Sequence, residues 1–285
     1  MPMNKECGSE SINPINIFRY YKFQWKFHAL HPDYMEADGL LIFVGPQGSG
    51  KSLSAVNYVY KLLDKYPKSK ICTNLLLTDF PIVTYEMYKK TQADYIKQLI
   101  EDGCKEEQIE YWIYKDYLKD NRVYPFIDND DFIKYENGEE GIIYLVDEIQ
   151  LYLNSLESKN INMEVVTEIS QQRKQRKHIV ATSQVFGRMA KPLREQFSNV
   201  VLCRRYFGFT QRNSLIDRDS IDSDSSSDTG LSGKVRRNFI WFHNPELMYT
   251  RYDTYYKIQR GKFVAGENQQ KDGYINADIK LSSNN

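Results

Sequence analysis

The sequence predicts an α/β fold with a mainly parallel central sheet flanked by helices. Three short apolar runs carry this expectation: residues 40–44, 142–146 and 178–182, each followed by small or polar side chains. Runs of this length between longer helix-like stretches are typical of strands that are buried on both faces of a parallel sheet. The first run is the most informative, because a glycine-rich octapeptide follows it directly.

Residues 45–52 read GPQGSGKS and stand between the first apolar run and a helix-like stretch. This is a P-loop in its expected context, in which backbone N–H groups and the helix N-terminus bind phosphates. We expect Lys51 to reach the β- and γ-phosphates and Ser52 to help hold Mg²⁺. The alternative is a loop that merely ends a strand. The nucleotide-binding residues are predicted to be Gly45, Pro46, Gln47, Gly48, Ser49, Gly50, Lys51, Ser52 and Leu53.

The apolar run 142–146 ends in two carboxylates, Asp147 and Glu148. Ligands of open α/β sheets bind at the carboxyl ends of the strands, so Asp147 is expected to hold the magnesium ion together with Ser52. Glu148 is the expected base that activates water. The alternative is that the acidic pair only caps the next helix.

The third apolar run ends at Gln184 and follows a basic stretch at 173–177. Gln184 is expected to contact the γ-phosphate or the attacking water, because an amide both donates and accepts hydrogen bonds. Arg173 or Arg176 is expected to reach a neighbouring subunit's nucleotide and neutralise charge in the transition state. The basic stretch is also compatible with a solvated helix end.

This set of residues resembles the FtsK–HerA superfamily of ring-forming DNA-pumping ATPases, whose fold is RecA/HerA-like. Within it, the sequence is most similar to the zonular occludens toxin-like branch found in phages. Two further stretches fit that branch, residues 71–74 (ICTN) and 251–255 (RYDTY), and the likeness covers about residues 38–260. The resemblance implies that Lys51, Ser52, Asp147 and Glu148 carry the nucleotide chemistry, with Gln184 as the sensor. Filamentous-phage members carry a membrane-spanning helix after the ATPase domain, and this sequence shows no such segment.

Composition excludes several classes of protein. Lysine and arginine number 38 and aspartate and glutamate also number 38, so the chain is not a uniformly basic DNA-coating protein. No apolar stretch approaches the roughly 20 residues that a bilayer requires, and no signal peptide is evident. The four cysteines share no metal-ligand spacing. We therefore expect a cytoplasmic protein, in the cytoplasm of an infected host cell if it is viral.

Three regions are expected along the chain: an N-terminal arm at 1–37, a P-loop ATPase domain at 38–260 and a polar tail at 261–285. Within the ATPase domain we expect a Tyr-rich helical insertion at 79–140 and a disordered Ser/Asp/Gly-rich loop at 217–233. The arm alternates aromatic and basic residues, which suits stacking on single-stranded nucleic acid, an edge strand or a docking arm.

The leading interpretation is an ATP-hydrolysing motor that translocates DNA, most simply for viral genome packaging through an oligomeric ring. Its cofactors are ATP and Mg²⁺. Its partners are DNA of unspecified strandedness, further copies in a hexameric or pentameric ring, and a viral capsid or portal protein. Two alternatives remain open. One is a phage morphogenesis or secretion ATPase of the zonular occludens toxin-like type, and the other is a P-loop kinase or nucleotide switch.

Overall fold

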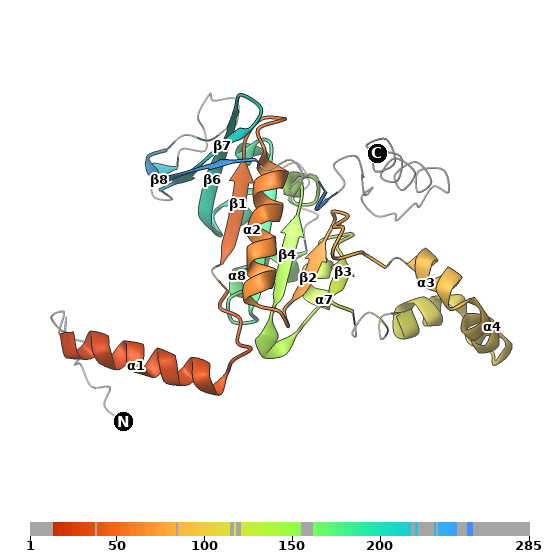
Figure 1. Cartoon of the computed structure of the whole chain (residues 1–285). Coiled ribbons are helices and arrows are strands. Elements are labelled where there is room, and N and C mark those ends of the chain that lie inside the picture. Colours follow the sequence, from red (N-terminus) through yellow and green to blue (C-terminus); the bar gives the residue numbers. More distant parts are fainter. Residues whose placement is uncertain are drawn as a thin grey trace, which may run out of the picture.

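The computed structural model describes residues 14–37, 39–83, 85–114, 117, 121–154, 162–217, 220–221, 231, 233–243 and 250–252. Within these ranges one eight-stranded sheet has the strand order β3-β2-β4-β5-β1-β6-β7-β8 (Figure 1). The strands are β1 Leu40–Val44, β2 Lys70–Thr73, β3 Val123–Pro125, β4 Ile142–Val146, β5 Lys177–Ser183, β6 Phe197–Tyr206, β7 Thr210–Ile216 and β8 Val235–Phe242.

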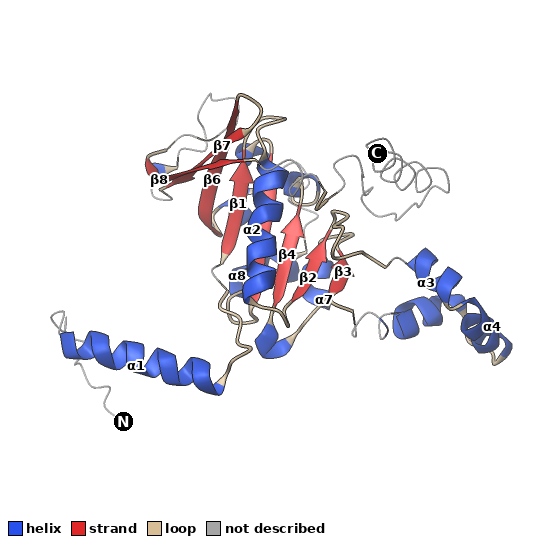
Figure 2. Ribbon diagram, in the orientation of Figure 1, coloured by secondary structure: helices blue, strands red, loops and turns tan. Residues whose placement is uncertain are grey.

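Helices of several types connect these strands (Figure 2). The α-helices are α1 Pro14–Leu30, α2 Lys51–Lys65, α3 Tyr85–Thr91, α4 Ala93–Glu101, α5 Glu106–Gln108, α7 Asp131–Lys134, α8 Met163–Gln171 and α9 Lys191–Arg194. The segment η1 Ile109–Tyr114 is a π-helix, and the short 3₁₀ turns are η2 Gly138–Glu140, η3 Ile149–Leu151 and η5 Phe186–Arg188.

The sheet is parallel from β3 through β6, and only the β6–β7–β8 end is antiparallel. The expected α/β fold with a mainly parallel sheet is therefore confirmed. Strand β5 lies between β1 and β4. This order matters for the site, because it places the end of β5 between the phosphate loop that follows β1 and the carboxylates that follow β4.

Side chains of the central strands alternate between two cores, one on each face of the sheet, as the two-residue period of a strand requires. In β1, Leu41 and Phe43 face the core that α2 covers, whereas Leu40, Ile42 and Val44 face the core that receives α8 and α9. Helix α2 covers the first face because its apolar positions recur at helical spacing and are buried. The sheet is thus the middle layer of three.

The predicted helical insertion differs from the structure in one respect. Residues 123–125, within the expected range 79–140, form β3 and pair in parallel with β2. A three-residue strand gives too short a pattern to be recognised from sequence. The helical part of the insertion runs from α3 to η1, and its buried Ile96 and Ile109 join the core on the α8 side.

The tyrosines of this insertion gather into one cluster. The ring of Tyr88 lies 5.5 Å from that of Tyr114 and 4.8 Å from that of Tyr117. The Tyr114 hydroxyl donates to the Val83 carbonyl at 2.6 Å, and burial raises the pKa of Tyr114. The Tyr-rich insertion therefore packs inward at Tyr114, while the side chain of Tyr111 lies outside the described residues.

The N-terminal arm is not an edge strand: residues 14–30 form the helix α1. An edge strand was one of the three interpretations that the alternation of aromatic and basic residues allowed. A helix satisfies its backbone hydrogen bonds internally, so this segment needs no neighbouring strand. Most of the predicted loop at 217–233, all of the tail at 261–285 and residues 253–255 lie outside the described residues.

None of the helices in the described ranges is both long enough and apolar enough to cross a bilayer.

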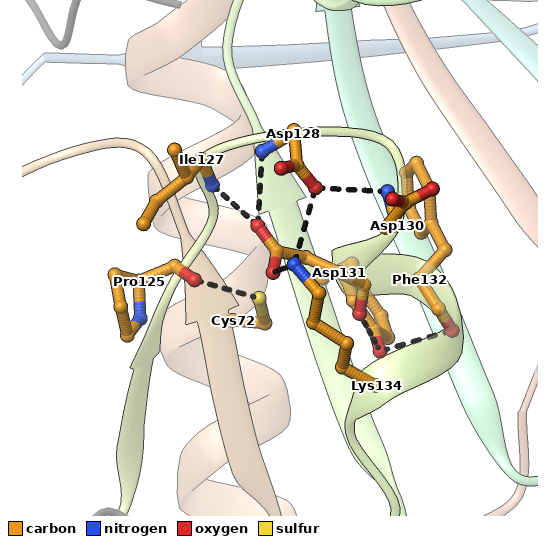
Figure 3. A network of polar contacts seen from close by, with 9 residues as sticks. Cys72, Pro125, Ile127, Asp128, Asp130, Asp131, Phe132 and Lys134 are labelled. Atoms are coloured by element: carbon orange, nitrogen blue, oxygen red, sulfur yellow. Dashed lines mark hydrogen bonds and ion pairs between the residues drawn. The ribbon is translucent and has the colours of Figure 1, made fainter. Parts of the chain in front are cut away.

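A buried carboxylate organises the turn between β3 and β4 (Figure 3). Asp131 Oδ2 accepts hydrogen bonds from the backbone nitrogens of Ile127 at 2.6 Å and Asp128 at 2.9 Å. Its other oxygen lies 3.1 Å from Lys134 Nζ. Burial raises the pKa of Asp131, which the Lys134 ammonium and the two backbone donors partly oppose. The side chain therefore ties the loop after β3 to α7.

Replacing Asp131 by Asn should lower the free energy of unfolding by about 1–3 kcal/mol. The amide cannot form the ion pair with Lys134, and its NH₂ group is a donor where the carboxylate had only acceptors. Urea-induced unfolding measures this change. The matched control is Asp130→Asn, one residue away on an exposed position, for which we expect a change within about 0.5 kcal/mol. Equal effects at both positions would show that the network does not stabilise the fold.

Candidate nucleotide-binding site

The carboxyl ends of β1, β5 and β4 lie side by side at one edge of the sheet (Figure 1). Val44 of β1 is in register with Ser183 of β5, and Val146 of β4 is in register with Ala181. The residues that follow each strand are therefore neighbours in space, although more than 30 positions separate them in sequence. This edge gathers most of the predicted site residues.

The phosphate loop connects β1 to the start of α2. Gly48 and Gly50 have φ angles of 77° and 80°, the left-handed region that favours glycine. Gly50 directly precedes α2, so the first N–H groups of that helix face the loop. Lys51 is buried and its ammonium donates to the Pro46 carbonyl at 3.1 Å. The loop thus folds around Lys51, and the positive charge of this side chain lies beside the N–H groups at the start of α2.

Asp147 joins the ends of all three strands. Its Oδ1 accepts hydrogen bonds from Ser52 Oγ and from Thr182 Oγ1, each at 2.7 Å. Its backbone is fixed by Asn74 at the end of β2, which accepts from Asp147 N at 2.8 Å and donates to Asp147 O at 2.9 Å. Two hydroxyls and an amide therefore hold this carboxylate in one position.

Burial is the largest influence on Asp147 and raises its pKa above the usual range. Hydrogen bonds from Thr182 and Ser52 lower the pKa, the neighbouring Glu148 raises it, and Lys51 lowers it least. The donors nearest this carboxylate are thus neutral hydroxyls. A bound cation would stabilise its charged form.

The oxygens of Ser52 and Asp147 suit Mg²⁺, which takes one or two protein oxygens and completes its coordination with phosphates and water. The described residues contain no cluster of three or more His, Cys, Asp or Glu side chains that would form a metal site without nucleotide. The donor set thus fits a magnesium ion carried in with a nucleotide, and the ligand roles of Ser52 and Asp147 stay a prediction.

Glu148 adopts a left-handed backbone conformation with φ 52°, which is uncommon for a residue other than glycine. Its backbone N donates to Thr182 Oγ1 at 2.9 Å. Gln184 Nε2 donates to Glu148 Oε1 at 2.9 Å, and Gln150 Nε2 donates to the other carboxylate oxygen. The strained backbone and two amides fix the direction of this carboxylate, and Gln184 lies beside it at the end of β5.

The structure does not bring Arg173 and Arg176 to this edge. Both lie in the turn before β5, whereas Gln184 follows its last residue, about 26 Å away from Arg176 along the strand. The Arg176 guanidinium sits 4.5 Å from the ring centre of Tyr34. Neither arginine can therefore act on the nucleotide of its own chain, and a role toward a neighbouring copy stays a prediction.

Several residues of the site were not predicted from sequence. Thr182 and Asn74 hold Asp147, and Arg205 and Tyr252 line the same pocket as the phosphate loop. For Thr182 and Asn74 the sequence does hold an indication: both are polar residues at strand ends, where ligands of open α/β sheets bind. No local pattern marks Arg205 as a pocket residue, and only the sheet order, with β6 beside β1, shows that it lies beside the nucleotide pocket.

Gln211 of β7 packs against the phosphate loop and holds it by a hydrogen bond. It is fully buried, and its amide nitrogen donates to the Ser49 carbonyl and to Asn213 Oδ1, each at 2.9 Å. A Cβ added at Gly50 would collide with Gln211 Oε1. The antiparallel end of the sheet therefore contacts the loop directly and requires glycine at this position.

The strand order, the phosphate loop after β1 and the paired carboxylates after β4 give this chain the α/β architecture of a P-loop NTPase. No protein-family model matches the chain, and no curated protein matches it in sequence.

Several solved structures are similar in fold. The N-terminal domain of zonular occludens toxin from Neisseria meningitidis is 16% identical with a TM-score of 0.43, over 75% of this chain and 98% of that one. The genome packaging NTPase of Sulfolobus turreted icosahedral virus 2, in complex with ATP-gammaS, is 13% identical with a TM-score of 0.41, over 59% and 76%. The flagellar accessory protein FlaH from Methanocaldococcus jannaschii is 12% identical with a TM-score of 0.39, over 72% and 85%. Since these TM-scores lie below 0.5, the assignment of the fold rests on the strand order and the phosphate loop.

Replacing Gly50 by Ala should destabilise the nucleotide-free protein more than replacing Gly48 by Ala. Both substitutions strain a positive φ, at a cost of about 1–2 kcal/mol, but only the Cβ at Gly50 meets another side chain. Adding Gln211→Ala to Gly50→Ala should recover part of the difference. Thermal unfolding without nucleotide measures all three. Equal loss in the two glycine variants would exclude the proposed contact with Gln211.

Proposed function

We propose that this chain hydrolyses ATP and uses the energy to move DNA. The observation that carries the proposal is the convergence of Ser52, Asp147, Glu148 and Gln184 at one edge of the sheet, beside Lys51 of the phosphate loop. In-line attack of water on a γ-phosphate requires hydrogen-bond donors that bind the phosphates, a carboxylate that is held in position and an amide. The glycine-rich loop binds the phosphates through its backbone.

Each residue has a distinct role in this proposal. Lys51 neutralises the β- and γ-phosphates, and Ser52 and Asp147 hold the Mg²⁺ that shields their charge. Glu148 accepts a proton from the attacking water, and Gln184 orients that water and the carboxylate together. Gln184 donates to Glu148 at 2.9 Å, so it stands where it can respond to the arrival or loss of the γ-phosphate.

A surface on the antiparallel end of the sheet supports DNA as the cargo. We call it the basic aromatic surface. It covers both faces of the sheet at this end and consists of exposed side chains on β6, on β8 and in the turn between β6 and β7: Arg204, Tyr206, Phe207, Phe209, Arg236, Arg237, Phe239, Ile240 and Phe242. Aromatic rings that stack on bases, together with arginines that contact phosphates, are the usual means of binding single strands. Phe207 is 86% exposed and Phe242 70%, which soluble surfaces seldom leave uncovered.

This surface adjoins the nucleotide site. Arg205, next to Arg204 on β6, lines the nucleotide pocket, and Gln211 on the neighbouring β7 contacts the phosphate loop. Strands β6, β7 and β8 thus connect the proposed DNA surface to the proposed ATP site within one rigid sheet. We propose a homo-oligomeric ring of six or five copies in the cytoplasm, with a viral capsid or portal protein as the receiver of the DNA.

Glu148→Gln should retain ATP affinity and lose about 10²–10⁴-fold in turnover, because the amide keeps the shape but cannot accept the proton. Lys51→Ala should instead weaken nucleotide binding. Equilibrium binding of a fluorescent ATP analogue and steady-state phosphate release separate the two effects. A Glu148→Gln protein that turns over ATP at the wild-type rate would refute the assignment of the base.

DNA should stimulate hydrolysis, and the stimulation should fall steeply with salt as phosphate contacts release counterions. Replacing Arg236 and Arg237 together by Ala should reduce the slope of log affinity against log salt by about 2, at unchanged basal turnover. The control is Lys61→Ala with Lys65→Ala on α2, outside the basic aromatic surface. Absence of stimulation at every salt concentration would favour a secretion ATPase or a P-loop kinase.

A further inference from the structure

Helix α1 exposes an unusual amount of apolar surface. Its exposed side chains include Trp25 at 72%, Phe18 at 69% and Tyr21 at 67%. The full set is Ile15, Ile17, Phe18, Tyr20, Tyr21, Phe23, Trp25 and Leu30. At 3.6 residues per turn these positions are spread around the whole circumference of the helix. A helix that is apolar on all sides is normally enclosed by other protein.

The charges of α1 are all of one sign. The helix carries Arg19, Lys22 and Lys26 and has no acidic residue, which gives a formal charge of +3. Their spacing of three and then four residues places them along one stripe of the helix. A surface that receives α1 must therefore be apolar and also acidic.

Outside α1, most of the exposed large apolar side chains of the described residues lie on two parts of the molecule, the basic aromatic surface and the helical insertion, and charge distinguishes these two. The basic aromatic surface carries three arginines and would repel the stripe on α1. The helical insertion from α3 to η1, residues 85–114, has seven acidic and four lysine residues, a net charge of −3. It also exposes Met87, Tyr95 and Ile100. The insertion alone combines exposed apolar groups with negative charge.

The two elements project from opposite flanks of the molecule. Figure 1 shows α1 extending from one side of the domain and α3 and α4 from the other side, beyond β3. One chain therefore cannot bring its own α1 onto its own insertion without unfolding the connection to β1. Two copies placed head to tail can do so, and each copy then offers both halves of the contact.

We propose that α1 of one copy packs on the helical insertion α3–η1 of the next copy, with the basic stripe facing the acidic insertion. At 1.5 Å per residue α1 is about 26 Å long, enough to lie across several helices of the insertion. The contact is heterologous, so it propagates and closes into a ring if the rotation between copies permits. It rests on the ring in the proposed function and names the contact that would build it, while its test requires neither ATP hydrolysis nor DNA.

Charge reversal of the full chain tests the contact. One variant carries Lys22→Glu with Lys26→Glu on α1, and the other carries Glu101→Lys with Glu107→Lys on the insertion; all four side chains are exposed. Each variant alone should sediment as a monomer under conditions in which the wild-type chain self-associates. The matched control is Lys61→Glu with Lys65→Glu on α2, with the same spacing and charge change, which should assemble as the wild type does.

Mixing the two reversed variants gives the decisive result. Every α1-to-insertion contact between unlike copies is again attractive, while contacts between like copies stay repulsive. The mixture should therefore recover assembly, in complexes that contain the two variants in equal number. Circular dichroism and nucleotide binding of each variant confirm that it is folded.

Three outcomes would overturn the proposal: a wild-type chain that remains monomeric, reversed variants that assemble as well as the control, or a mixture that fails to recover. Binding of the isolated wild-type chain to anionic vesicles or to DNA that is lost in the α1 variant, with self-association unchanged, would assign α1 to lipid or nucleic acid instead.

Discussion

One shared carboxylate oxygen holds the site together. Asp147 Oδ1 accepts a hydroxyl from Ser52 at the start of α2 and another from Thr182 at the end of β5. These bonds join the phosphate loop, the β5 strand end and the β4 strand end, which enter the site from three different parts of the chain. The oxygens of Asp147 and Ser52 that organise the site are also the type of ligand that Mg²⁺ takes from proteins. Structure and proposed chemistry therefore depend on one side chain.

The antiparallel end of the sheet extends this arrangement. Gln211 contacts the Ser49 carbonyl within the phosphate loop, and Arg205 lines the pocket that the loop opens into. Arg205 belongs to β6, which carries part of the basic aromatic surface, and Gln211 belongs to β7, which pairs with both β6 and β8. A movement of the phosphate loop must therefore displace β7 as well, because Gln211 is fully buried and cannot move independently of its neighbours. Such a connection is the physical requirement for coupling a nucleotide site to a surface that binds cargo.

Two further parts of the molecule lie outside the central sheet and differ in character. Helix α1 is exposed, aromatic and basic, whereas the insertion between α3 and η1 is acidic and packs its tyrosines inward through Tyr88 and Tyr114. The nucleotide site requires neither element for its own geometry. Their exposed side chains are explained most simply by contacts between copies, which a motor built as a ring would need.

The sequence by itself determined the phosphate loop and the fold class, because phosphate binding needs consecutive backbone N–H groups and buried parallel strands are short apolar runs. It also placed Asp147, Glu148 and Gln184 at strand ends. Only the tertiary structure decided which strand ends meet: the position of β5 between β1 and β4 brings Thr182 to Asp147. Residues 14–30 became a helix and 123–125 a strand, since pattern alone reveals neither a helix apolar on all sides nor a three-residue strand. Contacts such as Gln211 with Ser49 join residues 162 positions apart, and no local signal encodes them.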